Sequence, residues 1–144
     1  MTRRSGFTLI ELLLSIAIIG LIAGISLPIS ASMQRRNDLD ESTAIILAAG
    51  RRAVLLSQAV NADAGWSIHL GSGTVTLYQG ASYILRNQSF DEIDSLPVGV
   101  NTAGLADINF DKLTGWTATA GQITISNNSG SRNINVNAKG IFGY

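Results

Sequence analysis

The sequence predicts an α+β fold in which one long N-terminal helix packs against an antiparallel β-sheet. Three patterns predict it: an apolar run near the start, a helical stripe of apolar residues after it, and alternating apolar and polar residues from about residue 63. The chain has 144 residues, a length typical of one domain, so we expect these patterns to be parts of one fold.

The apolar run extends from Phe7 to Ile29 and matches the about 20 residues that span a hydrocarbon core. Arg3 and Arg4 precede it, and cations in this position keep the N-terminus cytoplasmic and send the rest of the chain outward. Glu11 is the only ionisable residue inside the run. A charge at the bilayer centre costs about 2.5–3.5 kcal/mol, and less near a helix end, so we expect Glu11 to have a positive partner.

The segment Gly6-Phe7-Thr8-Leu9-Ile10-Glu11 follows a basic leader and places Glu11 four residues after Phe7. It resembles the N-terminal processing and methylation motif of type IV pilins and type II secretion pseudopilins. The resemblance implies that a prepilin peptidase cuts after Gly6 and methylates the new amino group of Phe7. Residues 1–6 are then a leader, and residues 7–30 are the transmembrane and assembly helix. We further expect Glu11 to pair with the Phe7 amino group of a neighbouring subunit.

Two other interpretations of the N-terminal segment remain open. A cleaved secretory signal peptide would use a small-residue site such as Ala23-Gly24-Ile25 or Ser30-Ala31-Ser32. An uncleaved signal anchor would keep the leader on the mature protein. Neither interpretation explains Glu11.

Residues 31–62 are predicted to continue the helix with one apolar stripe. The members of the stripe recur at steps of three and four: Leu39, Thr43, Ile46, Leu47, Gly50 and Val54. Gly20 and Pro28 weaken the helix below the stripe, because glycine costs about 1 kcal/mol relative to alanine and proline removes a backbone donor. Pilins often have Gly and Pro at the matching places, so the resemblance favours a kink or local melting there over the usual abundance of these residues in membrane helices.

Residues 63–144 are predicted to form an exported β-sheet domain that packs on the striped part of the helix, which gives the ladle shape of pilins. Alternating residues mark strands around Trp66–Leu70, Val75–Leu77, Ile108–Phe110, Ile123–Ile125 and Ile134–Val136. Turn residues separate them, including Gly71-Ser72-Gly73 and Asn127-Asn128-Ser129-Gly130, so neighbouring strands are expected to form hairpins. Gln88–Asp107 is irregular and is predicted to be a loop with one short strand at Leu96–Val100.

Composition excludes several kinds of site. The chain has no cysteine, which excludes disulfides and thiolate metal sites, and its net charge of +0 gives no basic field for nucleic acid. His69, the single histidine, cannot build a zinc site without further ligands and is expected to be exposed on a strand. Asp91, Glu92 and Asp94 lack the spacing of a calcium loop and are interpreted as a solvated loop. We therefore expect no cofactor, no metal, no catalytic residues and no enzyme activity.

Beyond the N-terminus, the order of strands and turns resembles the H-type minor pseudopilins and related minor pilins. The resemblance is carried by Trp66–Leu70, Leu96-Pro97-Val98-Gly99, Asp107–Asp111, Thr114-Gly115, Gln122–Ser126, Arg132–Val136 and Asn137–Gly140. In some minor pilins the C-terminal tail is basic and serves DNA uptake, but the tail here, Gly140–Tyr144, has no Arg.

The resemblance implies a minor structural subunit that is anchored in the inner membrane and inserted into a type II secretion pseudopilus or a type IV pilus. Its partners would be other pilin or pseudopilin subunits, the prepilin peptidase and the inner-membrane assembly platform. Two alternatives are a major pilin that forms the filament body and an uncleaved, membrane-anchored ectodomain that binds a small ligand.

Overall fold

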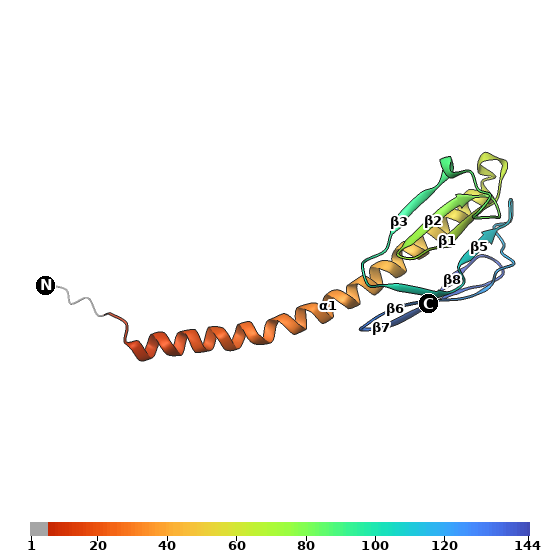
Figure 1. The fold of residues 1–144 in the computed structure, drawn as a ribbon. Helices are drawn as coiled ribbons and strands as arrows, with labels where there is room; N and C mark the ends of the chain where they lie inside the picture. The colour runs from red at the N-terminus through yellow and green to blue at the C-terminus, as the bar shows by residue number, and fades with distance from the viewer. Residues whose placement is uncertain (1–5) are drawn as a thin grey trace. The chain divides into compact units, whose positions relative to one another are not determined.

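The computed structural model describes residues 6–144, with side chains for 6–24 and 31–144. The chain divides into two compact units between Gln34 and Arg35. Helix α1 (Leu9–Gln58) runs through both units, and the strands all belong to the second unit (Figure 1).

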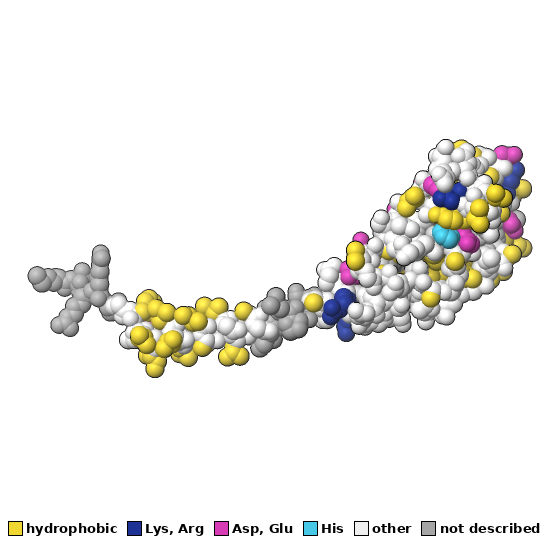
Figure 2. All heavy atoms as spheres, viewed as in Figure 1, with side chains coloured by type: hydrophobic (Ala, Val, Ile, Leu, Met, Phe, Trp, Pro, Cys, Tyr) yellow, Lys and Arg dark blue, Asp and Glu magenta, His cyan; other side chains and the backbone are white. Residues whose placement is uncertain are grey.

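The described part of the first unit is almost entirely α1. Its large apolar side chains, from Leu9 to Ile22, are strongly exposed, and Figure 2 shows them gathered along this part of the helix. Among the described residues, no helical segment combines the length and the apolar character needed to cross a membrane. The predicted span over residues 7–30 includes Ile25–Ser30, whose side chains lie outside the described part of the chain, and it stays a prediction.

In the second unit, α1 buries one stripe of side chains. Of the predicted stripe, all members are buried except Val54, which is partly buried, so the helical period was predicted correctly. Small residues on the same face, Ala49, Ala53 and Ser57, are also buried and allow the strands to approach closely. The helix ends at Gln58, earlier than the predicted end near Ala62.

The strands form two sheets of four, whereas the sequence predicted one sheet. The first sheet has the order β3-β2-β1-β5 and is antiparallel throughout. Its strands are β1 (Trp66–Leu70), β2 (Thr74–Gln79), β3 (Glu92–Ser95) and β5 (Asp107–Phe110). The second sheet has the order β4-β6-β7-β8, with β4 (Asn101–Gly104), β6 (Gly121–Asn127), β7 (Gly130–Val136) and β8 (Phe142–Gly143).

The prediction of a single sheet is wrong because β5 pairs with β1 rather than with the strand that follows it. Trp66 faces Phe110 and Ile68 faces Ile108 in this pairing. The hairpins β1–β2 and β6–β7 are confirmed. Local turn patterns predict hairpins well, but they carry no information about a partner about 40 residues away in the chain.

The predicted loop over Gln88–Asp107 is also wrong in part. It contains β3 and β4, while Leu96–Val100, predicted to be a strand, connects them. All four residues of β3 are exposed, so its sequence shows no alternation of buried and exposed positions. Leu96 and Val100 are the first and last residues of this connection, and both are buried. Their apolar character therefore reflects burial and not a strand.

One cluster of buried apolar side chains joins α1 to both sheets. It includes Ile46 from the helix, Ile68 and Ile108 from the first sheet, and Ile125 and Ile134 from the second, all fully buried. Each such side chain contributes about 1.5–3 kcal/mol by leaving water. Both sheets therefore pack against the same apolar stripe of α1.

Candidate functional site

The N-terminal motif begins helix α1 at a defined residue. Thr8 directly precedes the helix, and the Glu11 backbone N–H donates a hydrogen bond to the Thr8 Oγ1 at 3.3 Å. The Leu12 backbone N–H donates to the Thr8 carbonyl oxygen at 3.2 Å. Thr followed three residues later by Glu is the pattern of a capping box, a signal that the predictions from the sequence did not use. Thr8 therefore leaves Gly6 and Phe7 outside the helix.

Glu11 lies in the first turn of α1 and is exposed. The partial positive charge at a helix N-terminus favours a carboxylate there by about 0.3–1 kcal/mol. None of the ion pairs between described residues includes Glu11. Phe7 is 83% exposed, and Gly6 is exposed as well. The predicted cleavage site is thus accessible, and Glu11 lies one helical turn away from it.

The other two residues predicted to act in the helix are Gly20 and Pro28. Gly20 lies inside α1, which is continuous from Leu9 to Gln58. Pro28 falls among residues 25–30, whose side chains lie outside the described part of the chain. The predicted kink or local melting at Gly20 and Pro28 stays a prediction.

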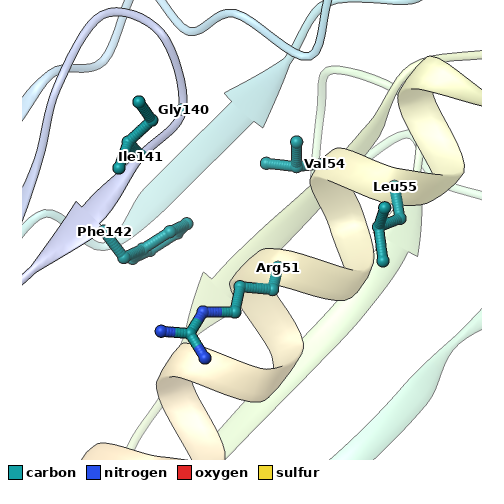
Figure 3. A pocket seen from close by; sticks show the side chains of 6 residues that line it. All are labelled: Arg51, Val54, Leu55, Gly140, Ile141 and Phe142. Carbon is teal, nitrogen blue, oxygen red and sulfur yellow. The ribbon is translucent and has the colours of Figure 1, made fainter.

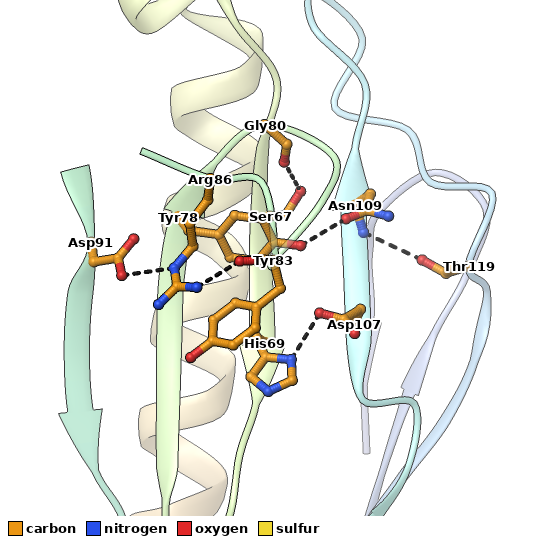
Figure 4. Close-up of polar contacts among 10 residues, drawn as sticks. All are labelled: Ser67, His69, Tyr78, Gly80, Tyr83, Arg86, Asp91, Asp107, Asn109 and Thr119. Carbon is orange, nitrogen blue, oxygen red and sulfur yellow. Dashed lines mark hydrogen bonds and ion pairs between the residues drawn. The ribbon is translucent and has the colours of Figure 1, made fainter. Parts of the chain in front are cut away.

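In the second unit, polar and aromatic side chains gather on the face of the first sheet that points away from α1. His69 on β1 lies opposite Asp107 on β5, and its Nδ1 is 2.8 Å from the Asp107 Oδ1. The loop after β2 lays Tyr83 flat on the imidazole ring, with 3.7 Å between the ring centroids (Figure 4). The side chain of His69 is only 22% exposed, so the prediction of an exposed histidine is wrong. A loop residue covers it, and no strand pattern predicts that.

The same cluster contains a buried tyrosine. Tyr78 on β2 is fully buried, and its hydroxyl donates a hydrogen bond to the Asn109 Oδ1 at 3.1 Å. Burial raises the pKa of the Tyr78 hydroxyl above its ordinary value, because the charged form would lose its hydration; a hydrogen bond with Ser67 opposes this rise in pKa.

Two of the three acidic residues in the predicted loop are paired with arginines. Asp91 accepts a hydrogen bond from the Arg86 Nε at 2.8 Å, and Glu92 accepts two from Arg52 of α1 at 2.6 and 2.7 Å. The described residues contain no group of three or more potential metal ligands. The Glu92 carboxylate therefore ties β3 to α1, and the Asp91 carboxylate closes the loop before β3 on itself.

An apolar groove of about 380 Å³ lies between α1 and the C-terminal segment (Figure 3). Val54, Leu55, Ile141 and Phe142 line most of it, and Arg51 is the one charged residue among its lining side chains. Phe142 packs on Gly50, where any side chain would overlap its ring. The lining contains no acid or base, so the groove offers contact surface rather than catalytic groups.

Comparison with known protein families gives two matches. The family model described as the prokaryotic N-terminal methylation motif matches residues 1–27. The family model described as type II transport protein GspH matches residues 40–140, which is more than half of the chain. The chain belongs to the GspH family.

No significant match accompanies these among curated proteins or among solved structures. As a member of the GspH family, the chain is a pilin-like structural subunit, a minor pseudopilin of a type II secretion or type IV pilus system. Such subunits are processed by prepilin peptidase, anchored in a membrane and assembled with other pilin subunits. The predicted resemblance to the H-type minor pseudopilins is therefore confirmed.

The GspH match covers the α1 stripe except Leu39 and every strand except β8, whereas the methylation motif covers the start of α1. Two separate matches, over residues 1–27 and 40–140, thus identify the N-terminal motif and the second unit of this GspH-family subunit. The cluster around His69 lies in the GspH part.

Proposed function

We propose that the chain is cut after Gly6, that the new amino group of Phe7 is methylated, and that Glu11 then pairs with this amino group on a neighbouring subunit. The position of Glu11 carries the proposal: it is a lone carboxylate in the first turn of an otherwise apolar helical segment. Thr8 supports it by capping a helix that begins at Leu9, two residues after Phe7, so that the amino group stays outside the helix.

The free energies favour pairing between subunits. Opposite charges at about 4 Å attract by roughly 4 kcal/mol at an effective dielectric near 20. The helix N-terminus stabilises Glu11 by only about 0.3–1 kcal/mol, so the amino group is the stronger of the two attractions. Each charge costs several kcal/mol to bury alone. A subunit inserted out of register would leave both charges unpaired, which makes the pair a check on register.

We also propose the location and the further partner of the subunit. Its N-terminus lies in the cytoplasm, the first part of α1 anchors it in the inner membrane, and the unit that begins at Arg35 is exported. The preceding Arg3 and Arg4 support this orientation. The partner that inserts the subunit into the filament is the inner-membrane assembly platform.

We propose further that the subunit is structural and not an enzyme. In the described part of the chain, several charged side chains of the exported domain pair with one another: Arg52 with Glu92 and Arg132 with Asp40 join α1 to strands, and Arg86 with Asp91 closes a loop. The apolar groove has one arginine and no acid or base to act with it.

Two measurements test the proposal. The intact mass of membrane-extracted protein should correspond to residues 7–144 plus one methyl group. Glu11→Gln should be cut and methylated normally but enter sheared filaments at least ten-fold less often, because the amino group loses its charged partner. Glu41→Gln is the matched control, since Glu41 is exposed on the exported part of α1, and it should assemble normally.

Retention of the six-residue leader in cells with active prepilin peptidase would refute the cleavage. Wild-type incorporation of Glu11→Gln would refute the pairing and leave the cleavage untouched.

A further inference from the structure

The loop between β2 and β3, residues 80–91, lies over the outer face of the first sheet. Tyr78 and Thr76 on β2 are buried although they point away from the helix. Tyr83 of the loop contributes to this cover, because its ring packs edge-on against Tyr78 at 5.5 Å between centroids and flat against His69. We name residues 80–91 the cover loop.

Tyr83 is the middle layer of a stack of three side chains. The His69 ring lies 3.7 Å from the Tyr83 ring centroid at an interplanar angle of 16°. The guanidinium carbon of Arg86 lies over the same ring, also 3.7 Å from its centroid. Two groups at this distance would overlap on one face, so they occupy opposite faces, as the side chains in Figure 4 are arranged. Tyr83 is therefore clamped between His69 and Arg86.

Each outer layer of the stack is held by a carboxylate. His69 contacts Asp107 on β5 through its Nδ1 at 2.8 Å. Arg86 donates to Asp91 at the end of the cover loop at 2.8 Å, and both side chains of that pair are about nine-tenths buried. Arg86 also donates to the Tyr83 carbonyl oxygen, which fixes the loop backbone.

The two outer layers differ in how they respond to pH. Arginine stays charged at all pH values that proteins tolerate, whereas histidine changes charge between pH 5 and 8. A neutral imidazole stacks on Tyr83 by dispersion alone. A protonated imidazole adds a cation–π attraction to Tyr83 and an ion pair with Asp107.

The charged and titratable groups around His69 come from three segments, β5, β2 and the cover loop, which ends at Asp91. They are Asp107 on β5, Tyr78 on β2, Tyr83 and Arg86 in the cover loop, and Asp91 just before β3. Arg86 repels a protonated His69, but it lies across the full thickness of the Tyr83 ring and is compensated by Asp91. Asp107 is in direct contact, so the attraction exceeds the repulsion.

We propose that the stack of His69, Tyr83 and Arg86 is a pH-responsive clamp that holds the cover loop to the first sheet more tightly as the pH falls from 8 to 5. Ile84 and Leu85 follow Tyr83 directly and are 90% and 86% exposed. The clamp therefore controls how rigidly an exposed apolar pair is presented on the surface of the exported domain.

The chain suits a spectroscopic test, because it has no cysteine and a single histidine. The full chain in detergent micelles, with Leu85→Cys carrying a nitroxide label, reports the mobility of the cover loop by electron paramagnetic resonance. The ratio of immobile to mobile label should rise about two- to five-fold between pH 8 and pH 5, as one exposed ion pair and one cation–π contact imply. A label at Asn128→Cys, in the β6–β7 turn, should show no such change.

Variants separate the clamp from general effects of pH. His69→Gln keeps a hydrogen-bond donor for Asp107 but cannot titrate, so its label ratio should be constant across the range. Asp107→Asn should reduce the change, and Tyr83→Leu should leave the label mobile at both pH values. Circular dichroism establishes that each variant is folded, and a misfolded His69→Gln is replaced by Asp107→Asn as the deciding variant.

A label ratio in the unsubstituted chain that does not change with pH would overturn the proposal. A pH response that persists in His69→Gln, or that is undiminished in Asp107→Asn when that variant decides, would overturn it as well.

Discussion

At the scale of single residues, Ser57 joins three elements through one small side chain. Its Oγ accepts a hydrogen bond from the Trp66 backbone N–H at 2.8 Å and lies 3.4 Å from the carbonyl oxygens of Trp66 and Phe110. Ser57 is fully buried on α1, while Trp66 begins β1 and Phe110 ends β5. The hydroxyl thus supplies a buried acceptor for the backbone N–H that begins β1.

Replacing this serine should be costly. In Ser57→Ala the Trp66 N–H stays buried without an acceptor, which costs about 1–3 kcal/mol of unfolding free energy. Urea denaturation measures the loss. Ser131→Ala, an exposed serine on β7, should change the free energy by less than about 0.5 kcal/mol. Equal effects of the two substitutions would show that the Ser57 hydroxyl has no special role.

Tyr78 predicts a dependence of stability on alkaline pH. Burial raises its pKa in the folded state, so the folded chain keeps the proton at pH values where the unfolded chain has lost it. The stability from this group is full below about pH 10, the ordinary pKa of tyrosine, and is lost as the pH rises through the folded-state pKa. Tyr78→Phe should therefore lose less unfolding free energy between pH 9 and pH 11 than the unsubstituted chain does.

The control for this comparison is Tyr144→Phe, because Tyr144 is 88% exposed. It should follow the alkaline curve of the unsubstituted chain in thermal melts. A Tyr78→Phe curve that coincides with the other two would contradict the assignment to burial.

At the scale of elements, α1 ends in an unusual corner. After Gln58, three residues without a glycine among them adopt left-handed backbone angles: Val60 and Ala62 at φ 53° and Asp63 at φ 58°. Each costs a non-glycine residue about 1–2 kcal/mol. The corner turns the chain from α1 into β1, whose first residue contacts Ser57. The contacts made by β1 offset this cost.

Glycine should relieve part of the cost at the corner. Ala62 is exposed, so Ala62→Gly removes steric strain without removing buried surface, and the gain exceeds the added entropy of the unfolded chain. We expect a net stabilisation of about 0.5–1 kcal/mol by thermal denaturation. Ala48→Gly, exposed within α1, should instead destabilise by about 1 kcal/mol. Destabilisation by both substitutions would show that the corner is unstrained.

The elements that the sequence predicted are those with a local signal. The stripe of α1 follows from spacing alone, and the hairpins β1–β2 and β6–β7 follow from alternation around a turn. Strand β3 could not be predicted in this way, because Glu92 to Ser95 are exposed on both faces of an edge. The pairing of His69 with Asp107 depends on β1–β5 pairing, and its cover by Tyr83 depends on a loop. Both contacts join His69 to residues outside its own strand, so the residues around His69 do not predict them.

At the scale of the whole molecule, the buried apolar core formed by the described residues lies within the second unit. Its members range from Leu39 to Phe142 and come from α1 and both sheets. The N-terminal motif contributes nothing to this core, although it carries the signal for processing. The core of the second unit is therefore separate from the motif that we propose acts in processing and assembly.

This separation predicts that residues 35–144 fold without the preceding segment. Expressed alone, they should be soluble and monomeric, melt in one cooperative transition, and retain the far-ultraviolet circular dichroism expected of the second unit. Starting the chain at Ile46 is the contrasting truncation, since it removes Leu39 and Thr43 from the buried stripe and should abolish the transition. A fragment 35–144 without a cooperative melt would show that the core needs the N-terminal segment.

The order of the strands has a consequence for how this domain comes apart. Along the chain, β3 lies in the first sheet, β4 in the second, β5 in the first again and β6 in the second. Because consecutive strands alternate between the two sheets, unfolding one sheet also displaces strands of the other. A partly unfolded form therefore loses strand pairing in both sheets and gains little conformational entropy in return. The second unit should therefore resist traction as a single body and then fail all at once, a useful property in a subunit that is assembled with other pilin subunits.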